Sequence, residues 1–197
     1  MAAPAFDPLV DLDGLWTTAL ADRFLPDPQL PSASYESVNG RLFVSPTEVH
    51  TNSWGELKLA RLVADAAESA GFSLSGPVNL KFDEGTWIQP DLTVLHTLPK
   101  TDEEDRWVPS AYCTMVVEFV SRSNRRKDFV ATPDLCAKGG VPYFLRVELV
   151  RRLSHASAQL FRLTDGRYEP VVEATAGQVF EAVEPFPMRF DPRQLLP

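Results

Sequence analysis

The chain has 197 residues, of which 44% are hydrophobic and 23% are charged, a balance typical of a globular domain rather than a disordered chain. Its formal net charge of −8 argues against broad attraction to nucleic acid, so any contact with a polyanion must be local. Two cysteines are too few for a disulfide framework or a zinc site, the N-terminus lacks the basic flank of a secretory signal, and no apolar run approaches the ~20 residues of a membrane span. We therefore expect a cytoplasmic protein.

The N-terminal part of the chain predicts a helix followed by a β-hairpin. Apolar residues at helical spacing indicate one helix over residues 8–24, which Pro26 ends. Asn39-Gly40 lies between two β-prone runs and is typical of a two-residue type I′ turn.

A long helix is expected next, over residues 47–70. Gly71 is placed to end it in the left-handed conformation. Ser53 and Glu56 have the spacing of a capping box, which would move the helix start later.

Strands dominate the rest of the chain, with one more helix that ends at Gly139-Gly140. Alternating or continuous apolar runs predict strands at 78–82, 88–95, 111–121 and 141–149, and further β structure over 151–190. This order predicts an α/β fold, a mixed β-sheet core flanked by helices, with an N-terminal helix and β-hairpin extension. We expect a single domain, 1–197, with an extension at 1–33, a core at 34–150 and a β-rich segment at 151–197.

Two acids interrupt apolar strands. Glu118 lies within the run VVEFV, and Asp91 follows Pro90 in a second such run. An ionised carboxylate is rarely buried without a cation or hydrogen-bond donors, and two carboxylates on neighbouring strands can bind a hard cation such as Mg²⁺. Alternatively, each acid simply emerges from a strand end into solvent.

The order of several short motifs resembles the Uma2 family of restriction endonuclease-like proteins, within the PD-(D/E)XK nuclease superfamily. The matching segments are YESVNGRLFVSP, then His50, QPDLTVL, VVEFVSRSNRRKD and AKGGVPYFLRVE. They run in the family's order from Tyr35 to Glu148. The resemblance implies a restriction-endonuclease-like fold and metal-dependent hydrolysis of DNA phosphodiester bonds.

For the site, the resemblance implies two metal-binding acids and a lysine, and Glu36 is a further candidate for a catalytic acid. Asp91 and Glu118 would bind Mg²⁺ or Mn²⁺, and Glu36 would be a third catalytic acid, unless it is an exposed hairpin residue. The superfamily's lysine position is Val120 here, and the family's alternative position is Thr132. Thr132 precedes a proline and is also placed to cap a helix. The chain departs from the pattern at both positions, which predicts weakened cleavage.

A basic segment follows Glu118, with cations at Arg122, Arg125, Arg126 and Lys127. It is interpreted either as a DNA-backbone contact or as a solvated loop. His50 either lines the site or is a structural histidine at a helix end.

Given the net charge, DNA is the expected partner but its binding should be weak, and a homodimer is considered. The main alternative function is a catalytically inactive protein that binds nucleic acid or another partner on the same scaffold. A hydrolase or binding module that does not act on nucleic acid is the third.

Overall fold

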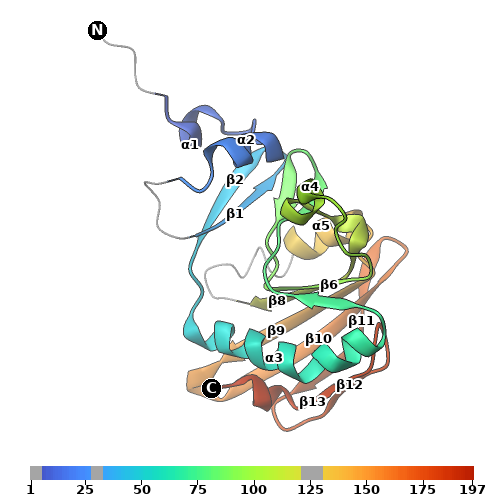
Figure 1. Cartoon of the computed structure of the whole chain (residues 1–197). Helices are drawn as coiled ribbons and strands as arrows, with labels where there is room; N and C mark the ends of the chain where they lie inside the picture. The colour runs from blue at the N-terminus through green and yellow to red at the C-terminus, as the bar shows by residue number, and fades with distance from the viewer. Residues whose placement is uncertain (1–5, 28–32, 121–130) are drawn as a thin grey trace.

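The computed structural model describes residues 6–27, 33–120 and 131–197. Its strands form one six-stranded sheet, one five-stranded sheet and a separate two-stranded pair (Figure 1). The six-stranded sheet has the order β11-β10-β9-β8-β6-β3 and the five-stranded sheet the order β2-β1-β5-β4-β7.

The six-stranded sheet consists of β3 (Ser73–Ser75), β6 (Leu92–Leu95), β8 (Cys113–Val120), β9 (Tyr143–Val150), β10 (His155–Thr164) and β11 (Arg167–Thr175). The five-stranded sheet consists of β1 (Ala33–Val38), β2 (Arg41–Pro46), β4 (Leu80–Asp83), β5 (Thr86–Ile88) and β7 (Val108–Pro109). The pair is β12 (Phe180–Ala182) and β13 (Met188–Phe190). The α-helices are α1 (Pro8–Asp11), α2 (Thr18–Phe24), α3 (His50–Ser69), α4 (Asp102–Arg106) and α5 (Thr132–Lys138). Short 3₁₀ turns are η1 (Ser110–Tyr112), η3 (Arg151–Leu153) and η4 (Pro192–Leu195).

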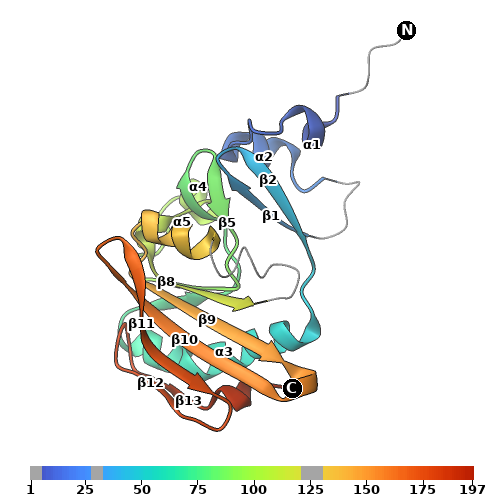
Figure 2. The ribbon, with the colours of Figure 1, turned by 180° about the vertical axis from the view of Figure 1, so that it is seen from behind.

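The six-stranded sheet is mixed and has a helix on each face. Its central strands β8 and β9 are parallel, whereas β8 pairs antiparallel with β6, and β9 with β10. Val117 of β8 belongs to the same core cluster as Leu59 and Val63 of α3. The next residue back, Val116, packs instead with Cys136 of α5, as the alternation of side chains along a strand requires. Figure 2 shows the strands β9 to β11 in front of α3. The predicted α/β fold is confirmed.

Strand β8 is buried at all eight positions, because α3 covers one face and α5 the other. This double cover explains why its sequence is a nearly continuous apolar run rather than an alternating one.

The hairpin of β1 and β2 has the expected turn, with Asn39 at φ 52° and Gly40 at φ 77°. Both residues are left-handed, as a type I′ turn requires. Gly71 also ends α3 as expected, at φ 85°. Its amide bonds the carbonyl of Glu68 and the amide of Phe72 bonds that of Ala67, which is a Schellman motif.

Three local predictions are wrong. The helix expected over 8–24 is two short helices, with Gly14 at φ 79° between them. The strand expected over 88–95 is two strands, since residues 89–91 leave the ladder between β5 and β6. The capping box of Ser53 and Glu56 is absent: α3 begins at His50, after Val49, without a side-chain cap.

The hairpin turn is held against the N-terminal segment. The amide of Trp16 donates to the carbonyl of Gly40, and the amide of Gly40 donates to that of Gly85. A Cβ on Gly40 would lie 2.6 Å from the carbonyl oxygen of Gly14, whereas one on Gly166, at the same φ of 77° in the β10–β11 turn, would meet nothing within 4 Å.

The two glycines therefore form a matched pair. Gly166→Ala should cost about 1–2 kcal/mol for a left-handed alanine, and Gly40→Ala should cost about 1–3 kcal/mol more because of the backbone clash. Urea unfolding of both variants measures the difference. Equal losses of unfolding free energy would show that the hairpin turn is not packed against residue 14.

Candidate metal centre

Asp91 is positioned where the β6–β8 ladder ends. Continuing the antiparallel register beyond Leu92 would bring Pro90 opposite Phe119, but a proline has no amide hydrogen to continue the ladder. Beyond Leu92, side chains rather than backbone groups bond to the backbone of Phe119. The amide of Phe119 donates to Oδ2 of Asp91 at 2.5 Å, and Nδ2 of Asn52 donates to the carbonyl of Phe119 at 3.3 Å. These two bonds join the end of β6, strand β8 and helix α3 at one point.

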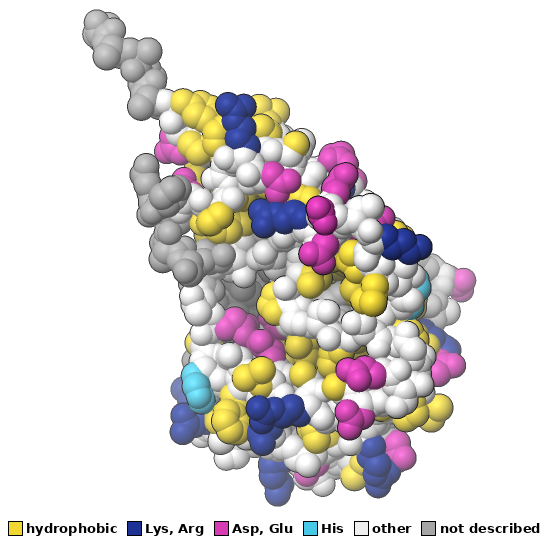
Figure 3. Space-filling model, in the orientation of Figure 1, with side chains coloured by type: hydrophobic (Ala, Val, Ile, Leu, Met, Phe, Trp, Pro, Cys, Tyr) yellow, Lys and Arg dark blue, Asp and Glu magenta, His cyan; other side chains and the backbone are white. Residues whose placement is uncertain are grey.

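Two further acids meet Asp91 at this point. Glu56 lies one helical turn after Asn52, and Glu48 lies just before α3. One carboxylate oxygen from each of Glu48, Glu56 and Asp91 lies within 4.8 Å of the other two. Acidic side chains gather on this face beside the start of α3 (Figure 3). Three carboxylate oxygens at this separation form a set of hard ligands that suits Mg²⁺ or Mn²⁺.

The pKa of Glu56 reflects its burial and the closeness of the other two carboxylates. Burial above all, then a hydrogen bond with Glu48 and the charge of Asp91, raise the pKa of Glu56 from 4.5 to about 10. Its Oε1 atom is buried and has no hydrogen-bond partner among the described residues. Neutralising one carboxyl is the response expected when like charges share a partly buried site. A divalent cation would remove the need for that proton, so the residues fit a metal ion.

Glu118 and Glu36 lie beside this cluster but not within it. Glu118 follows Val117, where the pairing of β8 with β6 ends, and its buried side chain, 4% exposed, belongs to the α5 face of the sheet. Glu36 is 2% exposed and accepts a bond of 2.9 Å from the amide of Gln89, so the alternative of an exposed hairpin residue is wrong. The pKa of Cys136 in α5 is raised mainly by burial and then by electrostatic interaction with Cys113, Glu118 and Glu36.

We infer that Thr132 lies on the side of α5 that faces this second pair of acids. It is the first residue of α5 and is 2% exposed. Cys136, one turn later, lies on the same face of the helix and interacts with both Glu118 and Glu36. The helix cap is Ala131, without a side-chain bond, so Thr132 is not the cap that the sequence allowed.

The predicted basic segment lies outside the described residues; it comprises Arg122, Arg125, Arg126 and Lys127. His50 is exposed at the start of α3 and stacks on Trp54 with ring centroids 6.3 Å apart; both of its interpretations stay open.

Glu48 and Glu56 were missed from the sequence. Glu56 was assigned to a capping box, although its spacing of four from Asn52 places both on one helix face. Glu48 lies in a loop, where no periodicity marks it.

Comparison with known proteins supports a nuclease-like fold. A family model described as "Putative restriction endonuclease" matches residues 22–194. The crystal structure of "a putative nuclease belonging to DUF820 from Anabaena variabilis ATCC 29413" aligns with a TM-score of 0.61, over 88% of this chain and 95% of that chain. At 13% identity this likeness concerns the fold. No curated protein matches the sequence. Within the described residues, every helix is too short or too polar to span a membrane.

The raised pKa of Glu56 predicts a pH-dependent stability. The unfolded chain loses this proton near pH 4.5, while the folded protein keeps it until about pH 10. The contribution is thus fully present below pH 4.5 and is lost as the pH rises towards 10. Glu56→Gln removes the titrating group and keeps its shape. The melting temperature of the variant should match wild type at pH 4 and exceed it increasingly towards pH 9. Glu68→Gln, an exposed change on the same helix, serves as the control; a difference for Glu56→Gln that does not vary with pH would contradict the assignment.

Proposed function

Because the chain belongs to the Uma2 family, described as restriction endonucleases, we propose that it hydrolyses DNA phosphodiester bonds with Mg²⁺ or Mn²⁺ held by Asp91, Glu56 and Glu48. The observation that carries this proposal is the meeting of the three carboxylates where β6 ends. Asp91 is the acid that the family's P-D motif marks, and it lies in that cluster.

The ligands are positioned before any ion binds. Asp91 is oriented by the amide of Phe119, and Glu56 extends from α3, which is tied to the same residue through Asn52. Preorganised ligands lose little freedom when a cation binds. A bound divalent ion would supply a water of lowered pKa and would offset charge on the phosphate in the transition state.

Glu118 and Glu36 are proposed as positioning residues on the α5 face. Their neighbour at position 132 is where the family has its lysine, which would pair with these acids and reach the phosphate. Thr132 can do neither. The basic residues Arg122, Arg125, Arg126 and Lys127 are proposed to contact the DNA backbone.

The threonine is the observation that favours a second candidate, a protein that binds DNA or a partner without cleaving it. Since the other lysine position is Val120, both positions lack a cation. We favour a slow nuclease over a binding protein, because the three acids of the proposed metal centre are all present.

Metal binding tests the centre directly. Calorimetric titration of the wild type with Mn²⁺ should show one site, and Asp91→Asn and Glu56→Gln should each weaken it by about tenfold or more, since each removes a charged ligand. The control is Glu68→Gln, which removes one acid from the far end of α3 and should bind like wild type. Equal affinity in all four proteins would reject the centre.

Restoring the lysine tests the nuclease. Thr132→Lys should increase Mn²⁺-dependent cleavage of plasmid DNA by on the order of a hundred- to a thousand-fold, the usual effect of one transition-state donor. A lysine at this buried position is tolerable only with an acid partner, which Glu118 and Glu36 would provide.

Two controls make the result interpretable. Thr132→Met has similar length without charge and should give no gain, and adding Asp91→Asn to Thr132→Lys should abolish the gain. Rapid cleavage by wild type that depends on Asp91 would contradict the account of a missing lysine. A folded Thr132→Lys protein without activity would favour the binding protein.

A further inference from the structure

A pocket that is separate from the metal centre lies between α5 and strands β9 to β11 and has a volume of about 500 Å³. We call it the aromatic pocket. Three rings line it, those of Phe144, Phe161 and Tyr168, with ring centroids of Phe144 6.4 Å from Phe161 and 5.7 Å from Tyr168. Its size falls within the range of small-molecule sites.

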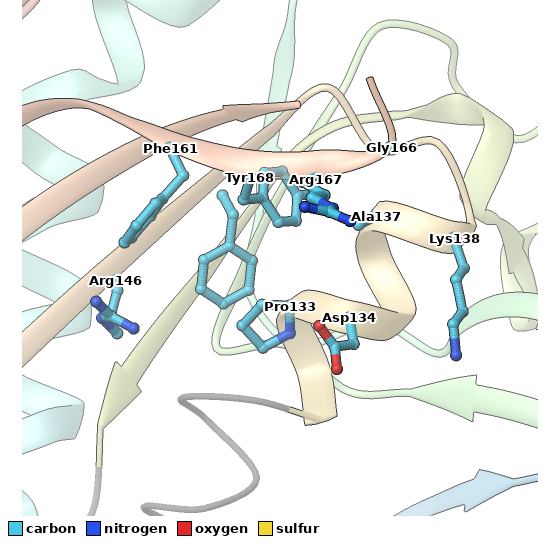
Figure 4. A pocket seen from close by; sticks show the side chains of 10 residues that line it. Pro133, Asp134, Ala137, Lys138, Arg146, Phe161, Gly166, Arg167 and Tyr168 are labelled. Carbon is cyan, nitrogen blue, oxygen red and sulfur yellow. The ribbon is translucent and has the colours of Figure 1, made fainter. Parts of the chain in front are cut away.

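Cations border the rings. The guanidinium of Arg146 lies 4.8 Å from the centroid of Phe161 and donates to Oε1 of Gln159. Arg167, the exposed first residue of β11, lies on the far side of the rings from Arg146 (Figure 4). Lys138 and one acid, Asp134, complete the charged lining. In a chain of net charge −8, this wall carries more cations than acids.

Aromatic rings beside guanidinium groups have a specific complement: a flat, apolar ring that carries an anion. Nucleobases stack on such rings whatever their identity, and guanidinium groups bind phosphate through paired donors. An aliphatic anion would leave the ring surfaces unused, and a neutral aromatic ligand would leave the arginines unused.

A register row of the sheet joins the pocket to Glu118. Glu118, Arg146 and Gln159 occupy this row across β8, β9 and β10. Neighbouring strands are about 4.8 Å apart, which sets the spacing between the Arg146 and Glu118 positions. A nucleic acid strand that leaves the pocket past Arg146 therefore runs towards Glu118.

We propose that the aromatic pocket binds one unpaired nucleotide, with its base on Phe161 and Tyr168 and its phosphate at Arg146 or Arg167. A base within a duplex is stacked and paired and cannot enter such a pocket, so the substrate is single-stranded or locally opened at this point. That the nucleotide belongs to a nucleic acid strand rests on the proposed nuclease function. That the pocket binds a nucleotide at all rests only on its rings and cations.

Binding measurements in EDTA separate this inference from the metal centre. The probes are a labelled short oligodeoxyadenylate, free deoxyadenosine monophosphate, and deoxyribose 5-phosphate, which lacks the base. The oligonucleotide or the monophosphate should bind wild type, and either source supports the pocket. Phe161→Leu should weaken that binding by on the order of tenfold through lost stacking, whereas Phe161→Tyr, which keeps the ring, should retain it.

The charged side has its own matched pair. Arg167→Gln should weaken binding severalfold, and Arg162→Gln, which removes an exposed cation that pairs with Glu184, should not. Asp91→Asn should leave binding of deoxyadenosine monophosphate unchanged, so failure of the metal centre and failure of the pocket give different results. Competition by deoxyribose 5-phosphate equal to that by the nucleotide would overturn the inference, as would unchanged affinity in Phe161→Leu and Arg167→Gln.

Discussion

The two hydrogen bonds at the backbone of Phe119 hold together the elements that form the proposed metal centre. Pro90 has no amide hydrogen to offer the carbonyl of Phe119, which accepts from Asn52 instead, while the amide of Phe119 donates to Asp91. A buried backbone group must find a partner, and leaving one without costs about 1–3 kcal/mol. The bond that satisfies the amide of Phe119 therefore also orients Asp91. The bond that satisfies its carbonyl holds α3, which carries Glu56, at the same point.

From this point the sheet divides the acids into two groups. Glu48 and Glu56 reach Asp91 from the α3 side, while Glu118 and Glu36 lie with Cys136 and Thr132 on the α5 side. In the proposed mechanism the acids on the α3 side bind a cation. The acids on the α5 side would orient a lysine side chain. The three acids of the first group are present, whereas the position of the lysine that the second group would orient holds Thr132.

Much of the fold follows from local signals, and two of the three failed local predictions share one physical cause. Asn39 and Gly71 specify their turn and helix end through backbone conformation alone, and both predictions are confirmed. The continuous strand over residues 88–95 and the capping role of Glu56 were wrong because each is decided by a partner distant in sequence. Glu48 and Glu56 approach Asp91 only through the packing of α3 on the sheet, and no local pattern records that contact.

An anomalous diffraction experiment on crystals grown with Mn²⁺ tests the central claim most directly. The account predicts a single strong anomalous peak at ordinary metal–oxygen distances, roughly 2.0–2.2 Å, from Asp91, Glu56 and Glu48. A peak coordinated by Glu118 and Glu36 without Glu56, or crystals of intact protein with no peak at saturating Mn²⁺, would contradict it.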